Sequence, residues 1–139
     1  MSRFATYPTQ FKDKECLKAA LADEGYTIVE DHETAQQLFD WHGRATTYLD
    51  KTGDKANIIV RRQYVGGAAN DLGFKKNADG KYEAIISAYD SGKHNTQWMD
   101  GLTKNYSEKV IRKESNRFGL KPHSTQVMGG KKIIKYLIA

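Results

Sequence analysis

The segment from Asn95 to Gly119 constrains the fold of this 139-residue chain more than any other segment. Large apolar residues recur in it at helical spacing, at Trp98, Leu102, Tyr106 and Val110. Asn95 has a side chain that can cap the first turn, and Gly119 is suited to the left-handed conformation that ends many helices. The pattern predicts a helix of roughly five turns, at about 3.6 residues per turn, that forms the main wall of a core.

A shorter amphipathic helix is predicted near the N-terminus. Asp13 is a good N-cap, Glu15 lies in the expected first turn, and Gly25 follows the last turn. Apolar residues between these signals fall on one face, at Leu17, Ala20 and Leu21. Cys16 lies in the same helix, where a buried thiol is expected.

Segments rich in β-forming residues flank both helices. Strands are predicted over residues 4–11, 26–29, 56–64, 72–76, 81–88, 124–128 and 133–138. Asp79-Gly80 predicts a hairpin between two of them, and Gly129-Gly130 predicts a second hairpin at the C-terminus. Residues 31–54 leave two structures open, a helical turn over residues 32–39 or an irregular hairpin over residues 37–49, before a turn at residues 52–54.

The order of these elements predicts the fold class. Strand, helix, strands, helix and strands favour a single α+β domain over residues 1–139. We expect a ferredoxin-like antiparallel sheet with the two main helices packed on one face. The chain carries 39% hydrophobic residues and is long enough to form a core without disulfides.

Several classes of protein are disfavoured by composition. No apolar stretch has the length of a membrane span or of a secretory signal, so we expect a cytoplasmic protein without membrane contact. Cys16 is the one cysteine, which fits a reducing compartment. The histidines lack the close spacing of metal ligands, and we expect neither a metal site nor a cofactor.

Basic residues concentrate in the last third of the chain. Residues 1–100 carry 13 Lys and Arg against 15 Asp and Glu, whereas residues 101–139 carry 9 against 2. The candidate binding residues of this basic row are Lys109, Arg112, Lys113, Arg117, Lys121, Lys131 and Lys132. Either the row is a solvated helix face, partly neutralised by Glu108, or it contacts phosphates or an acidic partner. Like charges at this spacing oppose helix formation, which suggests that something compensates them.

A glycine-bearing loop is a second candidate site. Its residues, Arg61, Gly66, Gly67, Asn70 and Asp71, follow a predicted strand, the general setting in which backbone amides bind phosphate. The loop lacks the Walker and dinucleotide-binding spacings, which favours a plain turn.

Two arginines and three tyrosines that could bind a ligand are predicted to have structural roles instead. Arg61 and Arg62 would point to opposite strand faces, and an arginine on the covered face needs Asp71, Glu83 or an anionic ligand as a partner. The tyrosines that could stack on nucleic acid bases are predicted to be core residues instead; they are Tyr64, Tyr82 and Tyr106.

Several motifs resemble one known family. They include the opening Met1-Ser2-Arg3-Phe4, Thr9, Lys12 and Asp13, the stretch Ile58-Ile59-Val60-Arg61, the stretch Asn70-Asp71-Leu72-Gly73-Phe74 with Tyr82 and Asp90, and Trp98, Leu102, Tyr106, Glu114, Ser115 and Gly119. The chain resembles the conserved proteins of cyanobacteria and algal plastids called hypothetical chloroplast reading frame thirty-five, a domain of unknown function. The resemblance implies a shared fold, and the plastid stroma if that context holds, but it supplies no catalytic residue or cofactor.

We therefore expect a non-enzymatic binding or adaptor domain, because no catalytic constellation is present. It would engage a macromolecular partner or an anionic ligand through the basic C-terminal helix. Direct binding of RNA, DNA or a nucleotide is the alternative. A small enzyme is the second alternative, using His32 with Glu33 or His42 with Asp40. The partner is an unidentified protein or polyanion, and open sheet edges make a homodimer possible.

Overall fold

The computed structural model describes residues 3–128 and 131–138, with side chains described for residues 3–119. The elements in chain order are β1 (Phe4–Tyr7), α1 (Lys14–Asp23), β2 (Glu30–Gln37), β3 (Lys55–Val60), α2 (Arg62–Val65), β4 (Leu72–Lys76), β5 (Tyr82–Ser87), the 3₁₀ turn η1 (Tyr89–Gly92), α3 (Thr96–Arg117), β6 (Leu120–Met128) and β7 (Lys131–Ile138). None of the described helices combines the length and the apolarity that crossing a membrane requires.

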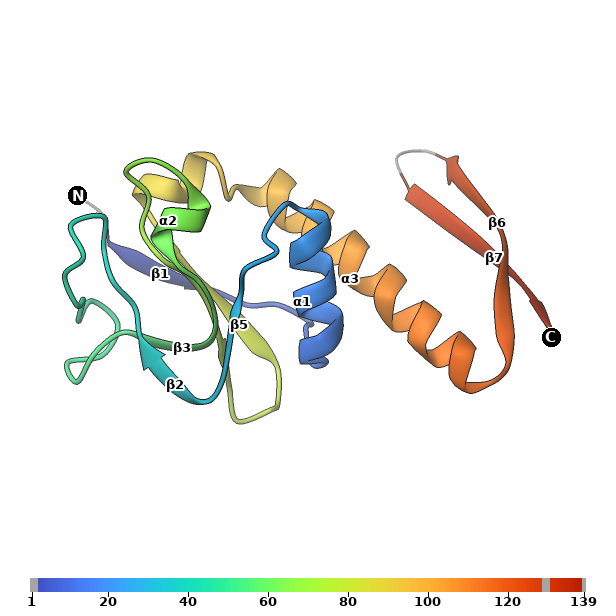
Figure 1. Ribbon diagram of the computed structural model, residues 1–139, viewed down its shortest axis with the longest axis horizontal. Helices are drawn as coiled ribbons and strands as arrows, with labels where there is room; N and C mark the ends of the chain where they lie inside the picture. The colour runs from blue at the N-terminus through green and yellow to red at the C-terminus, as the bar shows by residue number, and fades with distance from the viewer. Residues whose placement is uncertain (1–2, 129–130, 139) are drawn as a thin grey trace.

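Five strands form one antiparallel sheet in the order β1-β5-β4-β3-β2. The last four strands follow one another as a meander, and β1 pairs with the outer side of β5. Strands β6 and β7 form a separate antiparallel pair, which lies beyond the C-terminal end of α3 in Figure 1. The α+β class with two main helices is confirmed, whereas the ferredoxin-like detail is not.

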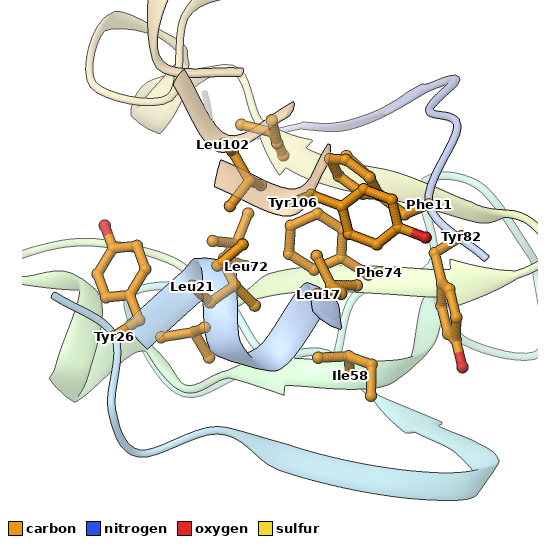
Figure 2. Packing of buried hydrophobic residues seen from close by; sticks show 14 of the residues in the cluster. Phe11, Leu17, Leu21, Tyr26, Ile58, Leu72, Phe74, Tyr82, Leu102 and Tyr106 are labelled. Atoms are coloured by element: carbon orange, nitrogen blue, oxygen red, sulfur yellow. The ribbon is translucent and has the colours of Figure 1, made fainter. Parts of the chain in front are cut away.

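Helices α1 and α3 cover one face of the sheet (Figure 1). Buried side chains of both helices meet the inward residues of β3, β4 and β5 in one cluster (Figure 2). Phe11, which follows β1, packs its ring 4.6 Å from that of Tyr106 and 6.3 Å from that of Phe74. The Tyr106 hydroxyl accepts hydrogen bonds from the backbone N–H groups of Lys12 and Asp13, at 2.8 and 2.9 Å. This hydroxyl therefore joins α3 to the start of α1.

Both main helices begin and end at the predicted residues. The Asp13 carboxylate accepts from the N–H of Cys16 at 3.0 Å, and the Asn95 side chain accepts from the N–H of Trp98 at 2.9 Å. Gly25 and Gly119 follow the two helices with φ angles of +97° and +72°. Cys16 is buried as predicted, and burial raises the pKa of its thiol.

The opposite face of the sheet has a smaller core under residues 38–54. Leu38 from this segment packs with four strand residues, Phe4, Ala56, Ile59 and Ile85. Phe39 and Ala45 form an isolated antiparallel bridge, so the segment is the irregular hairpin of the two predicted alternatives. The Asp54 carboxylate holds it closed by accepting from the N–H groups of Tyr48, Leu49 and Asp50.

Three predicted strand boundaries are wrong. The predicted strand over residues 26–29 is absent, because the chain joins the sheet only at Glu30. The predicted strand over residues 56–64 ends at Val60, since the following residues turn into α2 and bond to a buried carboxylate described below. The first strand ends at Tyr7, just before Pro8, which has no N–H for the ladder.

The C-terminal hairpin is longer than predicted, because its strands pair from Leu120↔Ile138 to Met128↔Lys131. The hairpin over residues 72–88 is confirmed, and Gly80 lies in its turn with a φ angle of +80°. The Gly129-Gly130 turn lies outside the described residues.

Gly73 provides a test of the packing in the smaller core, which contains Leu38 and Ala56. A Cβ atom at this position would lie 2.7 Å from the Cβ of Ala56 and 3.1 Å from both methyl carbons of Leu38. We expect Gly73→Ala to lower the free energy of unfolding by about 1–3 kcal/mol through overpacking, as measured by urea denaturation.

Gly67→Ala is the matched control, because a Cβ there meets nothing within 4 Å. Its midpoint should equal or slightly exceed that of the unmodified protein. Equal midpoints for the two variants would contradict this account of Gly73.

Candidate functional site

The buried carboxylate of Asp71 organises one end of the sheet. One oxygen accepts from the N–H of Phe39 and from the Arg61 guanidinium, both at 2.8 Å. The other oxygen accepts from the N–H of Arg62 at 2.7 Å. These bonds join the hairpin segment and the start of α2 to the residue that precedes β4. Asp71 is 2% exposed, so the bonds lie in the protein interior.

Asn70 extends this arrangement toward η1. Its side-chain oxygen accepts from the N–H of Trp41 at 2.8 Å, and its amide nitrogen donates to Ser87 Oγ at 2.9 Å and to Asp90 at 3.2 Å. Its backbone N–H donates to the same Asp90 oxygen at 2.9 Å. Asn70 is fully buried, so its polar groups bond within the protein.

The predicted partner of Arg61 is confirmed in part. Arg61 pairs with Asp71 as expected, but its second carboxylate is Glu30 of β2, at 2.7 and 2.9 Å, and not Glu83. Arg61 and Arg62 do not alternate along a strand, because Arg61 directly precedes α2 and Arg62 is the first residue of that helix. The sequence could not show this pairing, since Glu30 and Arg61 are distant along the chain.

The glycine-bearing loop lies around this network. Gly66 ends α2 with a φ angle of +138°, and its N–H donates to the Arg62 carbonyl. Gly67 is exposed. Arg61, Asn70 and Asp71 are brought together, but their polar groups already have partners within the protein. Arg61 bonds to the Glu30 and Asp71 carboxylates, and Asn70 bonds to Trp41, Ser87 and Asp90. A ligand at this loop stays a prediction.

A cleft of about 510 Å³ opens beside the network. We call it the aromatic cleft, and its lining residues are Asp40, Trp41, His42, Arg44, Tyr48, Ala68 and Tyr89. Trp41, Tyr48 and Tyr89 are 45%, 41% and 64% exposed, which is high for large aromatic side chains. The cleft therefore presents three rings to solvent in one hollow.

Buried polar groups fix the backbone of Trp41 and Tyr48 and the residue that follows Tyr89. Asn70 binds the N–H of Trp41, and the Asp54 carboxylate binds the N–H of Tyr48 at 2.9 Å. Tyr89 directly precedes Asp90, which is buried against Asn70. The three rings are thus exposed, while hydrogen bonds to buried side chains hold the backbone near them.

Charged groups at the cleft are mostly basic. Arg44 lines it, the Arg62 guanidinium donates to the Trp41 carbonyl at 3.0 Å, and the Arg3 guanidinium lies 5.5 Å from the ring centre of Tyr48. Asp40 is the one acidic lining residue, and one of its oxygens accepts from the N–H groups of His42 and Arg44. Among the described residues, none of these three arginines has an ion-pair partner.

The basic row of α3 is placed differently. Each of its four described members has a carboxylate partner within the chain. The pairs are Lys109 with Asp23 at 2.6 Å, Arg112 with Glu108 at 2.6 Å, Lys113 with Asp13, and Arg117 with Glu114 at 3.6 Å. Two of these pairs join α3 to α1, which compensates the repulsion within the row. The side chains of Lys121, Lys131 and Lys132 lie outside the described residues.

The histidines do not form the predicted proton-transfer pairs. His32 contacts Glu30 at 2.7 Å and not Glu33, and Asp40 binds the backbone N–H of His42 and not its ring. The His42 ring instead packs against the Trp41 ring, with ring centres 3.6 Å apart and planes tilted by 38°. His123 lies outside the region with described side chains. Among residues with described side chains, no group of three or more His, Cys, Asp or Glu could hold a metal ion.

Sequence reasoning missed most of the cleft. Tyr82 and Tyr106 are core residues as predicted, but Tyr64 is 45% exposed. Tyr48 and Tyr89 carried no prediction, because neither belongs to a periodic segment. One signal was available in the sequence. Trp41 and Tyr48 are aromatic residues in a segment without hydrophobic periodicity, which could have indicated that they are exposed.

Comparison with known proteins gives one match. The model of a family described as protein of unknown function (DUF1257) matches residues 20–133. No curated protein and no solved structure matches the chain. The matched stretch begins within α1 and contains the whole aromatic cleft. The match supports a family of unknown function, while the finer name of reading frame thirty-five stays a prediction.

Asp71→Asn tests the buried network. The amide keeps the shape but removes the charge opposite Arg61 and places a donor against other donors. We expect a loss of about 3–5 kcal/mol in the free energy of unfolding, the usual cost of breaking a buried pair. Urea denaturation measures it, with Asp79→Asn in the exposed hairpin turn as the control. A loss no larger than that of the control would show that the network does not organise the sheet end.

Glu30 makes stability depend on acid pH. The hydrogen bond from Arg61, assisted by that from His32, lowers the pKa of Glu30 below its ordinary value of 4.5, although burial opposes the shift. The folded state therefore binds this proton less readily than the unfolded chain does. The resulting stabilisation is present above the unfolded pKa and is lost as pH falls through the folded pKa.

The free energy of unfolding should decline as the pH falls below the pKa that Glu30 has in the unfolded chain. We expect this decline to be less steep in Glu30→Gln. Denaturation at a series of acid pH values measures this slope. Glu33→Gln on the same strand, at an exposed position, should leave the slope unchanged. Parallel profiles for Glu30→Gln and the unmodified protein would contradict the assignment.

Proposed function

Since this chain belongs to the DUF1257 family of proteins of unknown function, we propose from its own geometry that it is a non-enzymatic binding domain. Its aromatic cleft binds a nucleotide unit, either free or within a single strand of nucleic acid. The observation that carries the proposal is the set of three exposed rings beside arginines that have no ion-pair partner among the described residues.

The rings supply surfaces for planar bases. Stacking of one base on an aromatic side chain contributes about 1–3 kcal/mol and tolerates any base. Trp41 and Tyr89 are among the most exposed large residues of the described chain, so a stacked base would remove apolar surface from water. Fixed backbone positions reduce the entropy lost on binding. The volume of about 510 Å³ fits the usual range for small-molecule sites.

The arginines supply charge for phosphate. A guanidinium can donate two parallel hydrogen bonds to a phosphate group, and it also stacks on rings. Arg44 and Arg3 have no carboxylate partner among the described residues, whereas Lys109 and Lys113 of α3 are paired with α1. Available positive charge therefore lies at the cleft more than on the described part of the basic row.

The basic row is the second candidate. The excess of 9 basic over 2 acidic residues in residues 101–139 favours it, and the Lys113 and Arg117 side chains are 58% and 70% exposed despite their partners. On this alternative, α3 and the adjoining hairpin engage an acidic protein surface or a polyanion. Binding would then depend on α3 and not on the cleft.

Fluorescence titration separates the two candidates. The probes are AMP, adenosine, inorganic phosphate and an eight-nucleotide single strand, at low and high salt. Trp41 is one of two tryptophans and the more exposed, so stacking should quench its emission. We expect binding of AMP or of the strand, weaker binding of adenosine and of phosphate, and a decrease with salt. Tighter binding of AMP would indicate a free nucleotide as the ligand, and tighter binding of the eight-nucleotide strand would indicate single-stranded nucleic acid.

Variants assign the site. Tyr89→Ala should weaken binding about 5- to 100-fold, the equivalent of one stacked base, and Arg44→Gln should reduce the salt dependence. Phe118→Ala, which removes a ring that is 66% exposed at the end of α3, is the matched control and should have no effect. Absence of binding to every probe at low salt would overturn the proposal. Loss of binding in Lys113→Gln but not in Tyr89→Ala would transfer the function to the basic row.

A further inference from the structure

The C-terminal hairpin of β6 and β7 is a two-stranded sheet separate from the five-stranded one. It lies beyond the C-terminal end of α3 (Figure 1). Its strands have 9 and 8 residues, against a usual length of about 5–6. In the described part of the chain, β6 is the one element that packs along β7. Two-stranded hairpins are at best marginally stable in water, so a further strand would stabilise this one.

The two outer edges of the C-terminal hairpin differ. Each edge carries backbone N–H and C=O groups that have no strand partner among the described residues. β6 contains Pro122, which lacks an N–H, and an extra residue between Pro122 and Ser124 breaks its register with β7. Prolines and bulges keep a strand edge from pairing with another chain. β7 has neither feature, so its outer edge is the one open to a further strand.

The residues of β7 restrict which strand can pair with it. Apart from its lysines, the strand is entirely apolar or aromatic, with the sequence KKIIKYLI. Its three lysines are Lys131, Lys132 and Lys135. Lysine on an edge strand opposes pairing, most strongly when it lies opposite another positive charge. A strand that pairs with β7 must therefore place an uncharged or acidic residue opposite each lysine.

A second copy of β7 meets this condition in one long register. A two-fold axis places one residue of an antiparallel pair opposite its own copy. Two such registers pair most of the strand, centred on Ile134 or on Lys135. The register centred on Lys135 places that lysine opposite itself. The register centred on Ile134 pairs residues 131–137 and places each lysine opposite an apolar or aromatic residue, in the pairs Lys131 with Leu137, Lys132 with Tyr136 and Lys135 with Ile133.

We propose that β7 is a dimerisation strand, which pairs antiparallel with β7 of a second copy of this chain in the register centred on Ile134. The two hairpins then form one four-stranded sheet across the two-fold axis. A strand of another protein would need its own match to the three lysine positions, whereas β7 already contains that match. The dimer does not depend on the function proposed for the aromatic cleft, since every residue that lines the cleft precedes α3.

A single cysteine tests the register in the full chain. Opposite residues of an antiparallel pair have Cα atoms about 4.5–5.5 Å apart, within the range of a disulfide. Ile134→Cys should therefore give a disulfide-linked dimer on mild oxidation. Leu137→Cys is the matched control, because at about 3.4 Å per residue it lies about 20 Å from its own copy and should stay unlinked. Cys16 is buried and is common to both variants.

Two substitutions at Tyr136 test the charges across the pairing. Both remove the ring and add one charge, and within its own hairpin Tyr136 pairs with the uncharged Pro122. Tyr136→Lys places a positive charge opposite Lys132 of the second copy, and Tyr136→Glu places a negative one there. With two such pairs per dimer, Tyr136→Lys should dissociate at least about fourfold more readily than Tyr136→Glu. Sedimentation velocity at a series of concentrations measures both dissociation constants.

Salt separates the dimer from the function proposed for the cleft. The described strands of the C-terminal hairpin carry four lysines and no acidic residue, so added salt should strengthen the dimer by screening their repulsion. Binding of AMP or of the nucleic acid strand at the cleft should instead weaken with salt. Either proposal can therefore fail while the other holds.

Three results would overturn the dimer. They are a monomer at every concentration up to the limit of solubility, equal disulfide yields from Ile134→Cys and Leu137→Cys, and equal dissociation constants for Tyr136→Lys and Tyr136→Glu. Ile134→Cys is a conservative change, so the disulfide remains a decisive test if the Tyr136 variants do not fold.

Discussion

The carboxylate of Asp71 is the interaction on which the rest of this domain depends. It neutralises Arg61 and binds two backbone N–H groups inside a site where water does not reach. A buried carboxylate is tolerated only when each of its oxygens is satisfied, and here the partners come from two separate segments, Phe39 of the hairpin segment and Arg61-Arg62 after β3. The position of the hairpin segment, the end of β3 and the start of α2 all follow from those bonds.

Local signals in the sequence predicted the elements whose structure is itself local. Asp13 and Asn95 cap α1 and α3 because their side chains reach N–H groups three residues along the chain. The Asp-Gly turn between β4 and β5 is equally local. The hairpin segment was left open for the opposite reason, since the bonds that attach it to the rest of the protein are made to residues about 30 positions away, as from Phe39 to Asp71 and from Trp41 to Asn70. Composition and periodicity contain no signal for such pairs.

The candidate sites show the same division. Charge counts predicted the basic row, but only the structure pairs Lys109 and Lys113 with the carboxylates of α1. The partner Asp71 was predictable for Arg61, because a strand arginine needs a carboxylate, whereas Glu30 was not. The aromatic cleft assembles from residues that no pattern connects. Composition records that aromatic residues and arginines are present, and the buried polar network determines which of them share a surface.

The long sequence separations in that network also set when the cleft can form during folding. Trp41 is bonded to Asn70, and Asn70 is bonded to Asp90, so closing the cleft requires two successive loops of 29 and 20 residues. Each loop costs chain entropy before its bonds form, so such contacts come later than the helices and the β4–β5 hairpin. A growing chain that ends before Asp90 therefore carries the rings of the cleft but not the cleft. The cleft would therefore form late, after most of its lining residues have been synthesised.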